Sequence, residues 1–326
     1  VLIQMIIFSI SALSTIFFGT YLAKYGDIIA SITGLGRLFV GSILVALATS
    51  LPELSANISA VTLNPPNPSL AIGNVLGANM VNMFMLGFIA LIFGGKVVLD
   101  QISYEQWYLA LLAFVITVAF LVLGFINIQL SLFNLGISSI ILLIIYLIGM
   151  RLVYVSKSFD VEDDDLSTDL NVGKYKAWIM FGMISIGVII SGYFLAFSVD
   201  KIAGISGIAS STLGIILVSI VTTMPEASAY FASIKMKAAD LGVAGLFGSC
   251  VFNVTIIFYA DIFYKNNLLV NQFEKAHYLA GFVASLLILL ALFIVLFNKK
   301  FNHILNKSLL ASLLIIYLLG IFIITS

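Results

Sequence analysis

The chain has 326 residues, of which 62% are hydrophobic and 9% charged, and its formal net charge is zero. This composition excludes an ordinary soluble domain, and the neutral charge balance argues against binding to nucleic acid. Apolar stretches of about 20 residues recur from one end to the other, a length typical of helices that cross a membrane. The sequence therefore predicts an all-α polytopic membrane protein whose general partner is the lipid bilayer.

Ten membrane spans are predicted in chain order, at 2–22, 38–63, 69–93, 105–126, 128–150, 177–198, 211–236, 240–261, 276–297 and 306–325. We interpret the first as a true span rather than a signal peptide, because it has no basic leading segment. The longest polar stretch, 151–176, is rich in acidic residues and is interpreted as a solvated cytosolic linker. It separates a first five-helix repeat, 1–150, from a second, 177–326.

The second and seventh spans each contain a proline that is followed directly by a glutamate. These pairs are Pro52-Glu53 and Pro225-Glu226, and the other three of the five prolines fall outside the predicted spans. A carboxylate in the hydrocarbon layer costs about 2.5–3.5 kcal/mol, so each glutamate is a candidate functional residue. A proline breaks the helix and frees backbone carbonyls. We therefore expect broken second and seventh helices with an acidic residue at each break.

The two halves of the chain also match one another at nearly constant offsets. The segment 49–53 matches 222–226 at an offset of 173, with identical first, fourth and fifth residues. The glycine-rich segment 77–82 matches 248–253 at an offset of 171. Because five spans is an odd number, the second half must enter the membrane in the opposite direction. The sequence therefore predicts two inverted repeats, and substrate sites lie where such repeats meet.

The distribution of basic residues predicts an orientation, because cytoplasmic loops carry an excess of Lys and Arg. With the N-terminus outside, the inside loops hold 12 of the 15 Lys and Arg residues. The outside loops hold the other 3, which are Lys201, Lys265 and Lys275. This pattern predicts a multi-pass protein of the cell membrane, with both termini outside and the linker in the cytosol.

Two carboxylates flanked by hydroxyls, freed carbonyls and amides suit a hard cation such as Ca²⁺, which takes about six to eight oxygen ligands. The candidate ligands are Glu53, Glu226, Thr49, Ser50, Thr222, Thr223, Asn82 and Asn253. His277 lies at a span end and His303 in a loop, which argues against a zinc or copper site. No cofactor and no obligate protein partner are expected. The alternative is structural: each glutamate packs against a hydroxyl, and the asparagines only join helices.

The segments 49–53 and 73–82 resemble the first alpha-repeat of the Ca²⁺/cation antiporter superfamily, and the segments 222–226 and 248–253 resemble the second. The resemblance is strongest to prokaryotic sodium/calcium exchangers. It implies that the two glutamates bind Ca²⁺ and compete for Na⁺. It also implies supporting roles for Thr49, Thr222, Ser50, Thr223, Ser249, Asn82 and Asn253. The first and sixth spans are then expected to slide over the other eight to alternate access.

Departures from the family pattern bear on the counter-ion. Ala78 stands where the first repeat usually has a serine, whereas Ser249 keeps that serine in the second repeat. Our interpretation is a secondary active antiporter, not an enzyme, that exports Ca²⁺ in exchange for Na⁺. The main alternative is a Ca²⁺/H⁺ exchanger in which both glutamates take up protons. A cation channel is a further alternative, although only two membrane carboxylates and no oligomeric ring motif are present.

Overall fold

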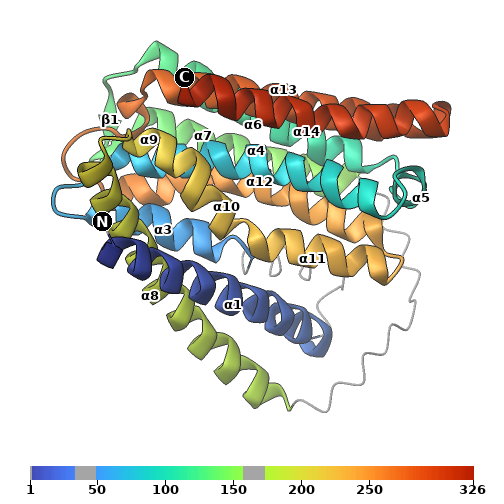
Figure 1. Ribbon diagram of the computed structural model, residues 1–326, viewed down its shortest axis with the longest axis horizontal. Helices are drawn as coiled ribbons and strands as arrows, with labels where there is room; N and C mark the ends of the chain where they lie inside the picture. Colours follow the sequence, from blue (N-terminus) through green and yellow to red (C-terminus); the bar gives the residue numbers. More distant parts are fainter. Residues whose placement is uncertain (1, 34–48, 157–172) are drawn as a thin grey trace.

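Long apolar helices dominate the computed structural model, which describes residues 2–33, 49–156 and 173–326 (Figure 1). Within these ranges, eight helices are long and apolar enough to cross a membrane, or nine if the bent pair Ser210–Thr222 and Met224–Lys235 forms one span. The predicted helical multi-pass class is therefore confirmed. The count of ten spans and the inversion of the second repeat remain predictions, and much of the predicted second span lies outside the described residues.

The described helices follow the predicted order. In the first half they are α1 (Leu2–Thr33), α3 (Leu51–Thr62), α4 (Pro68–Ile92), α5 (Lys96–Leu99), α6 (Gln106–Ile126) and α7 (Ile137–Ser156). In the second half they are α8 (Lys174–Ser206), α9 (Ser210–Leu213), the π-helix η1 (Gly214–Val218), α10 (Ser219–Thr222), α11 (Met224–Lys235), α12 (Ala239–Phe263), the 3₁₀-helix η2 (Leu269–Gln272), α13 (Lys275–Phe297), the 3₁₀-helix η3 (Asn298–Lys300) and α14 (His303–Thr325).

Helices α1 and α8 are longer than the spans predicted from hydropathy. They contain 32 and 33 residues, whereas the predicted spans were 2–22 and 177–198. Charged residues mark the end of a span predicted from hydropathy. They do not interrupt the hydrogen bonding of the helix backbone, so both helices continue beyond them. Helix α8 ends only at Gly207, which adopts a left-handed conformation with φ of 73°.

A short β-hairpin replaces the predicted start of the fifth span, so the prediction of helix from residue 128 is wrong. Strands β1 (Ser131–Leu132) and β2 (Leu135–Gly136) pair antiparallel, and α7 begins only afterwards. The two residues between the strands, Phe133 and Asn134, have φ values of 53° and 65°. Positive φ at both central residues is the requirement of a tight hairpin turn.

The hairpin is attached to α12 by the buried carboxylate of Asp261. Its Oδ2 atom accepts hydrogen bonds from the Gly136 backbone N–H at 2.7 Å and from Ser139 Oγ at 2.6 Å. Its Oδ1 atom accepts one from the Leu269 backbone N–H at 3.0 Å. One carboxylate therefore joins β2, α7 and η2 at the same end of the bundle.

Replacing this carboxylate is expected to destabilise the fold. In Asp261→Ala the buried N–H groups of Gly136 and Leu269 lose their acceptor, at about 1–3 kcal/mol for each unsatisfied group. We expect a lower unfolding temperature in detergent, measured by the intrinsic fluorescence of the two tryptophans. The exposed Asp100→Asn variant is the control, and equal unfolding temperatures for the two variants would contradict the assignment.

Helices α4 and α12 form the centre of the bundle. In the apolar stretch of each of these two helices 72% of the residues are buried, against 22–28% in the apolar stretches of α1, α7, α8 and α14. Helix α4 packs closely against α9 and η1, which form the first part of the predicted seventh span. A Cβ atom at Gly73 would lie 2.5 Å from the Ser211 carbonyl oxygen, and one at Gly214 would lie 2.5 Å from that of Leu70. The glycines thus allow the two backbones to come into direct contact.

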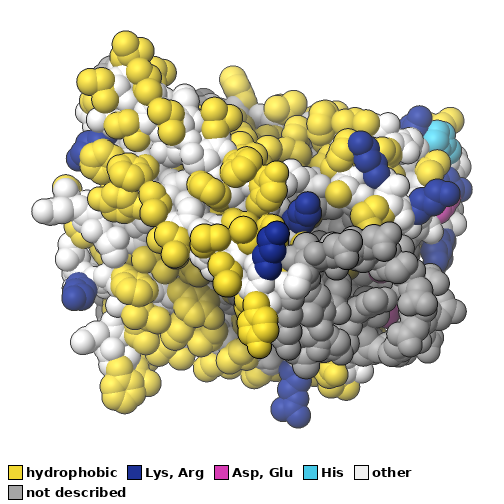
Figure 2. All heavy atoms as spheres, turned by 90° about the horizontal axis from the view of Figure 1, so that it is seen from below, with side chains coloured by type: hydrophobic (Ala, Val, Ile, Leu, Met, Phe, Trp, Pro, Cys, Tyr) yellow, Lys and Arg dark blue, Asp and Glu magenta, His cyan; other side chains and the backbone are white. Residues whose placement is uncertain are grey.

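Helices α1 and α8 pack against each other along one side of the bundle, below the central helices in Figure 1. Gly19 of α1 lies against Pro52 and Pro225, the prolines that precede the two glutamates. A Cβ atom at Gly19 would overlap Cγ of Pro225 and lie 3.3 Å from Cγ of Pro52. Figure 2 shows hydrophobic side chains over much of the face seen from below, as expected for a surface in contact with lipid.

Candidate cation site

Helices α3 and α11 begin near the middle of the bundle and run toward opposite ends (Figure 1). Glu53 and Glu226 lie in their first turns, directly after a proline. Proline suits this position because it lacks the N–H that a helix start leaves unpaired. The positive end of each helix dipole favours a carboxylate there. The seventh span bends by 41° at Thr223, so the predicted break is present.

Each carboxylate accepts a hydrogen bond from a hydroxyl of the other half of the chain. Ser50 Oγ donates to Oε1 of Glu226 at 3.3 Å. Thr223 Oγ1 donates to Oε1 of Glu53, also at 3.3 Å. Each hydroxyl lies three residues before the glutamate of its own half. The two hydrogen bonds therefore join corresponding positions of the two repeats. The halves therefore exchange donors across the site.

Ser249 of α12 completes the surroundings of Glu226. Its hydroxyl donates to Oε1 of Glu226 at 3.3 Å and lies 3.4 Å from Ser50 Oγ. It also accepts a hydrogen bond from Nδ2 of Asn82 at 3.2 Å. Ser249 is fully buried, and so are Ser50 and Asn82. The four side chains form one polar cluster inside an otherwise apolar bundle.

Four buried oxygen atoms around this cluster accept no hydrogen bond from any described residue: Glu53 Oε2, Glu226 Oε2, Asn82 Oδ1 and Asn253 Oδ1. Glu53 is 0% exposed and Glu226 is 3% exposed, so water does not reach these carboxylates freely. A buried acceptor without a donor costs about 1–3 kcal/mol, and more if it is charged. A cation would supply the missing partner, and an all-oxygen set suits a hard ion such as Ca²⁺ or Na⁺.

The remaining predicted ligands lie next to this cluster. Thr49 is buried beside Ser50. Thr222 Oγ1 donates a hydrogen bond to Oδ1 of Asn74 at 3.3 Å. Nδ2 of Asn253 donates to Oδ1 of Asn79 at 3.2 Å. The structure thus brings the nine predicted residues into one region, and it places Thr222 and Asn253 in a flanking layer.

Sequence reasoning missed Asn74 and Asn79, which hold this flanking layer. Nδ2 of Asn79 donates to Thr117 Oγ1 and to the Cys250 carbonyl oxygen, both at 3.2 Å. At the offset of 171, Asn74 corresponds to Gly245 and Asn79 to Cys250, so a search for repeated residues passes over both. The available signal was the presence of three asparagines in one apolar helix, α4.

Substitution of Ser249 is expected to weaken cation binding. In Ser249→Ala, Glu226 loses one hydroxyl donor and Asn82 loses its acceptor. We expect about a ten-fold weaker Ca²⁺ affinity, equivalent to about 1.4 kcal/mol. If Na⁺ binds here, its own affinity, measured without Ca²⁺, should also fall in Ser249→Ala and rise in Ala78→Ser. Calorimetry measures both quantities, with the half-buried Ser312→Ala as control, since its hydroxyl bonds only to the Ser308 carbonyl oxygen of the same helix. Unchanged values would show that these positions do not contact the ions.

Comparison with known proteins agrees with this geometry. The model of the sodium/calcium exchanger protein family matches residues 3–155 and 176–326. The chain belongs to this family. This confirms the predicted superfamily, which consists of transporters. Over 216 residues the chain is 25% identical to the uncharacterized membrane protein MJ0091 of Methanocaldococcus jannaschii, covering 66% of this chain and 67% of the relative. A segment of 66 residues is 36% identical to the sodium/calcium exchanger MaX1 of Methanosarcina acetivorans, covering 20% of this chain and 18% of that one.

Solved structures of other exchangers have the same fold. The H⁺/Ca²⁺ exchanger CAX matches with a TM-score of 0.67 at 13% identity, covering 98% of this chain and 88% of that one. The sodium-calcium exchanger NCX_Mj matches with a TM-score of 0.61 at 19% identity, covering 98% of each chain. At such identities the likeness concerns the fold alone. Exchangers of both counter-ion types share it.

Proposed function

We propose that this member of the family is a secondary active antiporter that exports Ca²⁺ across the cell membrane in exchange for Na⁺. The observation that carries the proposal is the pair of buried carboxylates, each with one oxygen that accepts no hydrogen bond from the described residues. Two carboxylates match the charge of one Ca²⁺. The similarity of a 66-residue segment to the sodium/calcium exchanger MaX1 supports Na⁺ as the counter-ion.

The buried charges also explain why transport would be an obligatory exchange. Without a cation, Glu53 and Glu226 would place two negative charges in a region that solvent does not reach. Charges in such surroundings interact more strongly than in water, so the empty site resists enclosure between the helices. Ca²⁺ or monovalent ions remove this obstacle. Only loaded states would then move between the two sides of the membrane.

The proposal includes ten spans arranged as two inverted five-helix repeats. The family model matches two segments of similar length, one in each half of the chain. Helices α3 and α11 both contain 12 residues, and α4 and α12 both contain 25. Both termini lie toward the same end of the bundle in Figure 1, as an even number of spans requires. The sliding elements in this arrangement are α1 and α8.

A Ca²⁺/H⁺ exchanger is the second candidate, and the asymmetry between Ala78 and Ser249 favours it. Ser249 supplies a hydroxyl to Glu226 at 3.3 Å, whereas the equivalent position in the first half has only a methyl group. A Na⁺ site there would lack one oxygen ligand, but protons taken up by the carboxylates would not need it. The fold likeness to the H⁺/Ca²⁺ exchanger CAX is compatible with this candidate.

Flux measurements in proteoliposomes separate these candidates. The purified chain is reconstituted, and Ca²⁺ uptake is followed under an outward Na⁺ gradient, under a pH gradient, or with neither. Uptake driven by Na⁺ alone supports the main proposal, and uptake driven by the pH gradient alone replaces it with the second candidate. Rapid uptake without either gradient would indicate a channel and contradict both antiporter assignments.

A further inference from the structure

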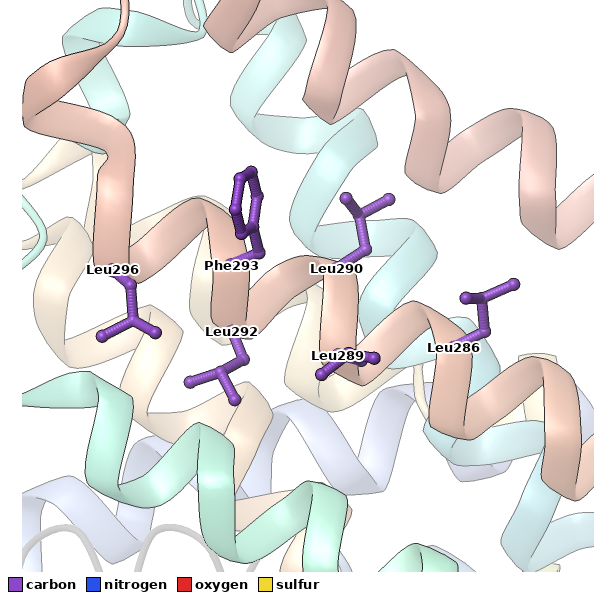
Figure 3. Close-up of a pocket in the computed structure, with 6 residues that line it drawn as sticks. All are labelled: Leu286, Leu289, Leu290, Leu292, Phe293 and Leu296. Carbon is purple, nitrogen blue, oxygen red and sulfur yellow. The ribbon is translucent and has the colours of Figure 1, made fainter.

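We propose that the protein binds an anionic phospholipid at the C-terminal end of α13. Two hollows meet there. The first is a groove of about 450 Å³ lined by residues of α13 alone: Leu286, Leu289, Leu290, Leu292, Phe293 and Leu296 (Figure 3). The second has a volume of about 370 Å³ and is lined by Tyr104 and residues 296–300. Leu296 lines both hollows, so they adjoin at this residue.

The first hollow suits an acyl chain. Every lining side chain is apolar, and Figure 3 shows Leu292 and Leu296 pointing to one side of the helix while Leu290 and Phe293 point to the other. Leu289 and Phe293 are 44% and 42% exposed, so the groove is open to its surroundings. In a chain that spans the membrane, those surroundings are lipid. An acyl chain is therefore the occupant that matches this part.

The second hollow suits a phosphate group. Lys299 and Lys300 line it and are exposed, and Lys300 Nζ lies 5.3 Å from the centre of the Phe297 ring. Neither lysine forms an ion pair with a described residue. Two unit positive charges exceed the partial negative charge of about one half at the end of α13. A phosphate placed here would continue directly into a chain in the groove.

Taken together with Lys299 and Lys300, the charges at this end leave a positive excess of one, with four lysines against three carboxylates. Helix α5 contacts both η3 and α14, which brings Lys96 and Lys307 to the same end. The acidic groups from the adjoining elements are Asp100, Glu105 and Asp240, and Asp240 already accepts a hydrogen bond from the Ser103 backbone N–H at 2.8 Å. Basic residues beside a membrane span attract anionic lipids.

Native mass spectrometry of the full chain tests this site directly, independently of transport. The probes are phosphatidylglycerol and phosphatidylcholine with the same acyl chains. We expect phosphatidylglycerol to bind more tightly, and its affinity to fall by about ten-fold in the Lys299→Gln/Lys300→Gln double variant. Phe293→Ala should also weaken binding, although it keeps both charges. Thermal unfolding of each variant verifies that it is folded.

The matched control is Lys235→Gln/Lys237→Gln. Lys235 Nζ also lies over a phenylalanine ring, 4.5 Å from the centre of Phe231, but neither lysine lines the two hollows. This control should bind phosphatidylglycerol like the unmodified protein. Equal binding of the two lipids, or an equal loss in the control, would overturn the proposal. Displacement of bound lipid by millimolar inorganic phosphate would assign the site to a free anion and overturn it as well.

Discussion

Glu53→Gln and Glu226→Gln are each expected to abolish Ca²⁺ transport while the protein still folds. Glutamine keeps the shape of glutamate but removes the charge, and one remaining carboxylate does not neutralise Ca²⁺. Each glutamate also accepts a hydrogen bond from the other half of the chain, with its acceptor oxygen 3.3 Å from the hydroxyl. We expect Ca²⁺ uptake into proteoliposomes to fall by roughly a hundred-fold or more, equivalent to about 2.7 kcal/mol.

The control for this experiment is Glu105→Gln, which removes a carboxylate at the start of α6, away from the cluster. It should transport Ca²⁺ at the unmodified rate. Thermal unfolding of all three variants distinguishes a lost site from a lost fold. Near-normal flux in either Glu53→Gln or Glu226→Gln would show that Ca²⁺ does not need both carboxylates, and the proposed site would be wrong.

Gly19→Val is expected to block transport and leave Ca²⁺ binding largely intact. A side chain at Gly19 would overlap Pro225 and press against Pro52, where α1 crosses the two proline segments. The predicted cation ligands lie on α3, α4, α10, α11 and α12 or directly before α3 and α11, so the site would remain. We expect roughly a ten-fold or greater loss of Ca²⁺ flux. Calorimetric Ca²⁺ affinity should change by less than about three-fold.

Gly182→Val on α8 is the matched control, because a Cβ atom at Gly182 meets no described atom within 4 Å. Both substitutions have the same effect on intrinsic helix propensity, so any difference reports the contact with the prolines. If Gly19→Val transports Ca²⁺ as fast as Gly182→Val, then close approach of α1 to the prolines is not needed for transport. A loss of Ca²⁺ binding in Gly19→Val would instead place α1 within the binding site.

The sequence predicted the helical class well because hydropathy is a strong signal in lipid, where each span must satisfy its own backbone. The positions that failed depend on other physics. Residues 128–136 are apolar enough to be included in a span, but the left-handed Phe133 and Asn134 close a hairpin there. The full length of α8 was missed because a helix ends where its backbone is interrupted, at Gly207, and not where charged side chains begin.

The candidate site was predicted where the repeat made it visible. Glu53 and Glu226, with Ser50 and Thr223, occupy matching positions, and the structure links them by equivalent bonds. Hydrogen bonds between different parts of the repeat were not predictable in this way. Ser249 reaches Glu226 and not Glu53, and Asn79 has no asparagine counterpart. Such contacts depend on how α4 and α12 face each other, which a single sequence does not specify.

The π-helix η1 sets the angular register of the seventh span. A π-helical turn contains one more residue than an α-helical turn. Gly214, at the start of η1, faces the backbone of α4, while Thr223, beyond its end, faces Glu53. Deleting one residue between them would restore a regular α-helix but rotate one face away from its partner by about 100°. The wide turn is therefore a built-in insertion that lets one stretch of chain serve two neighbours at once.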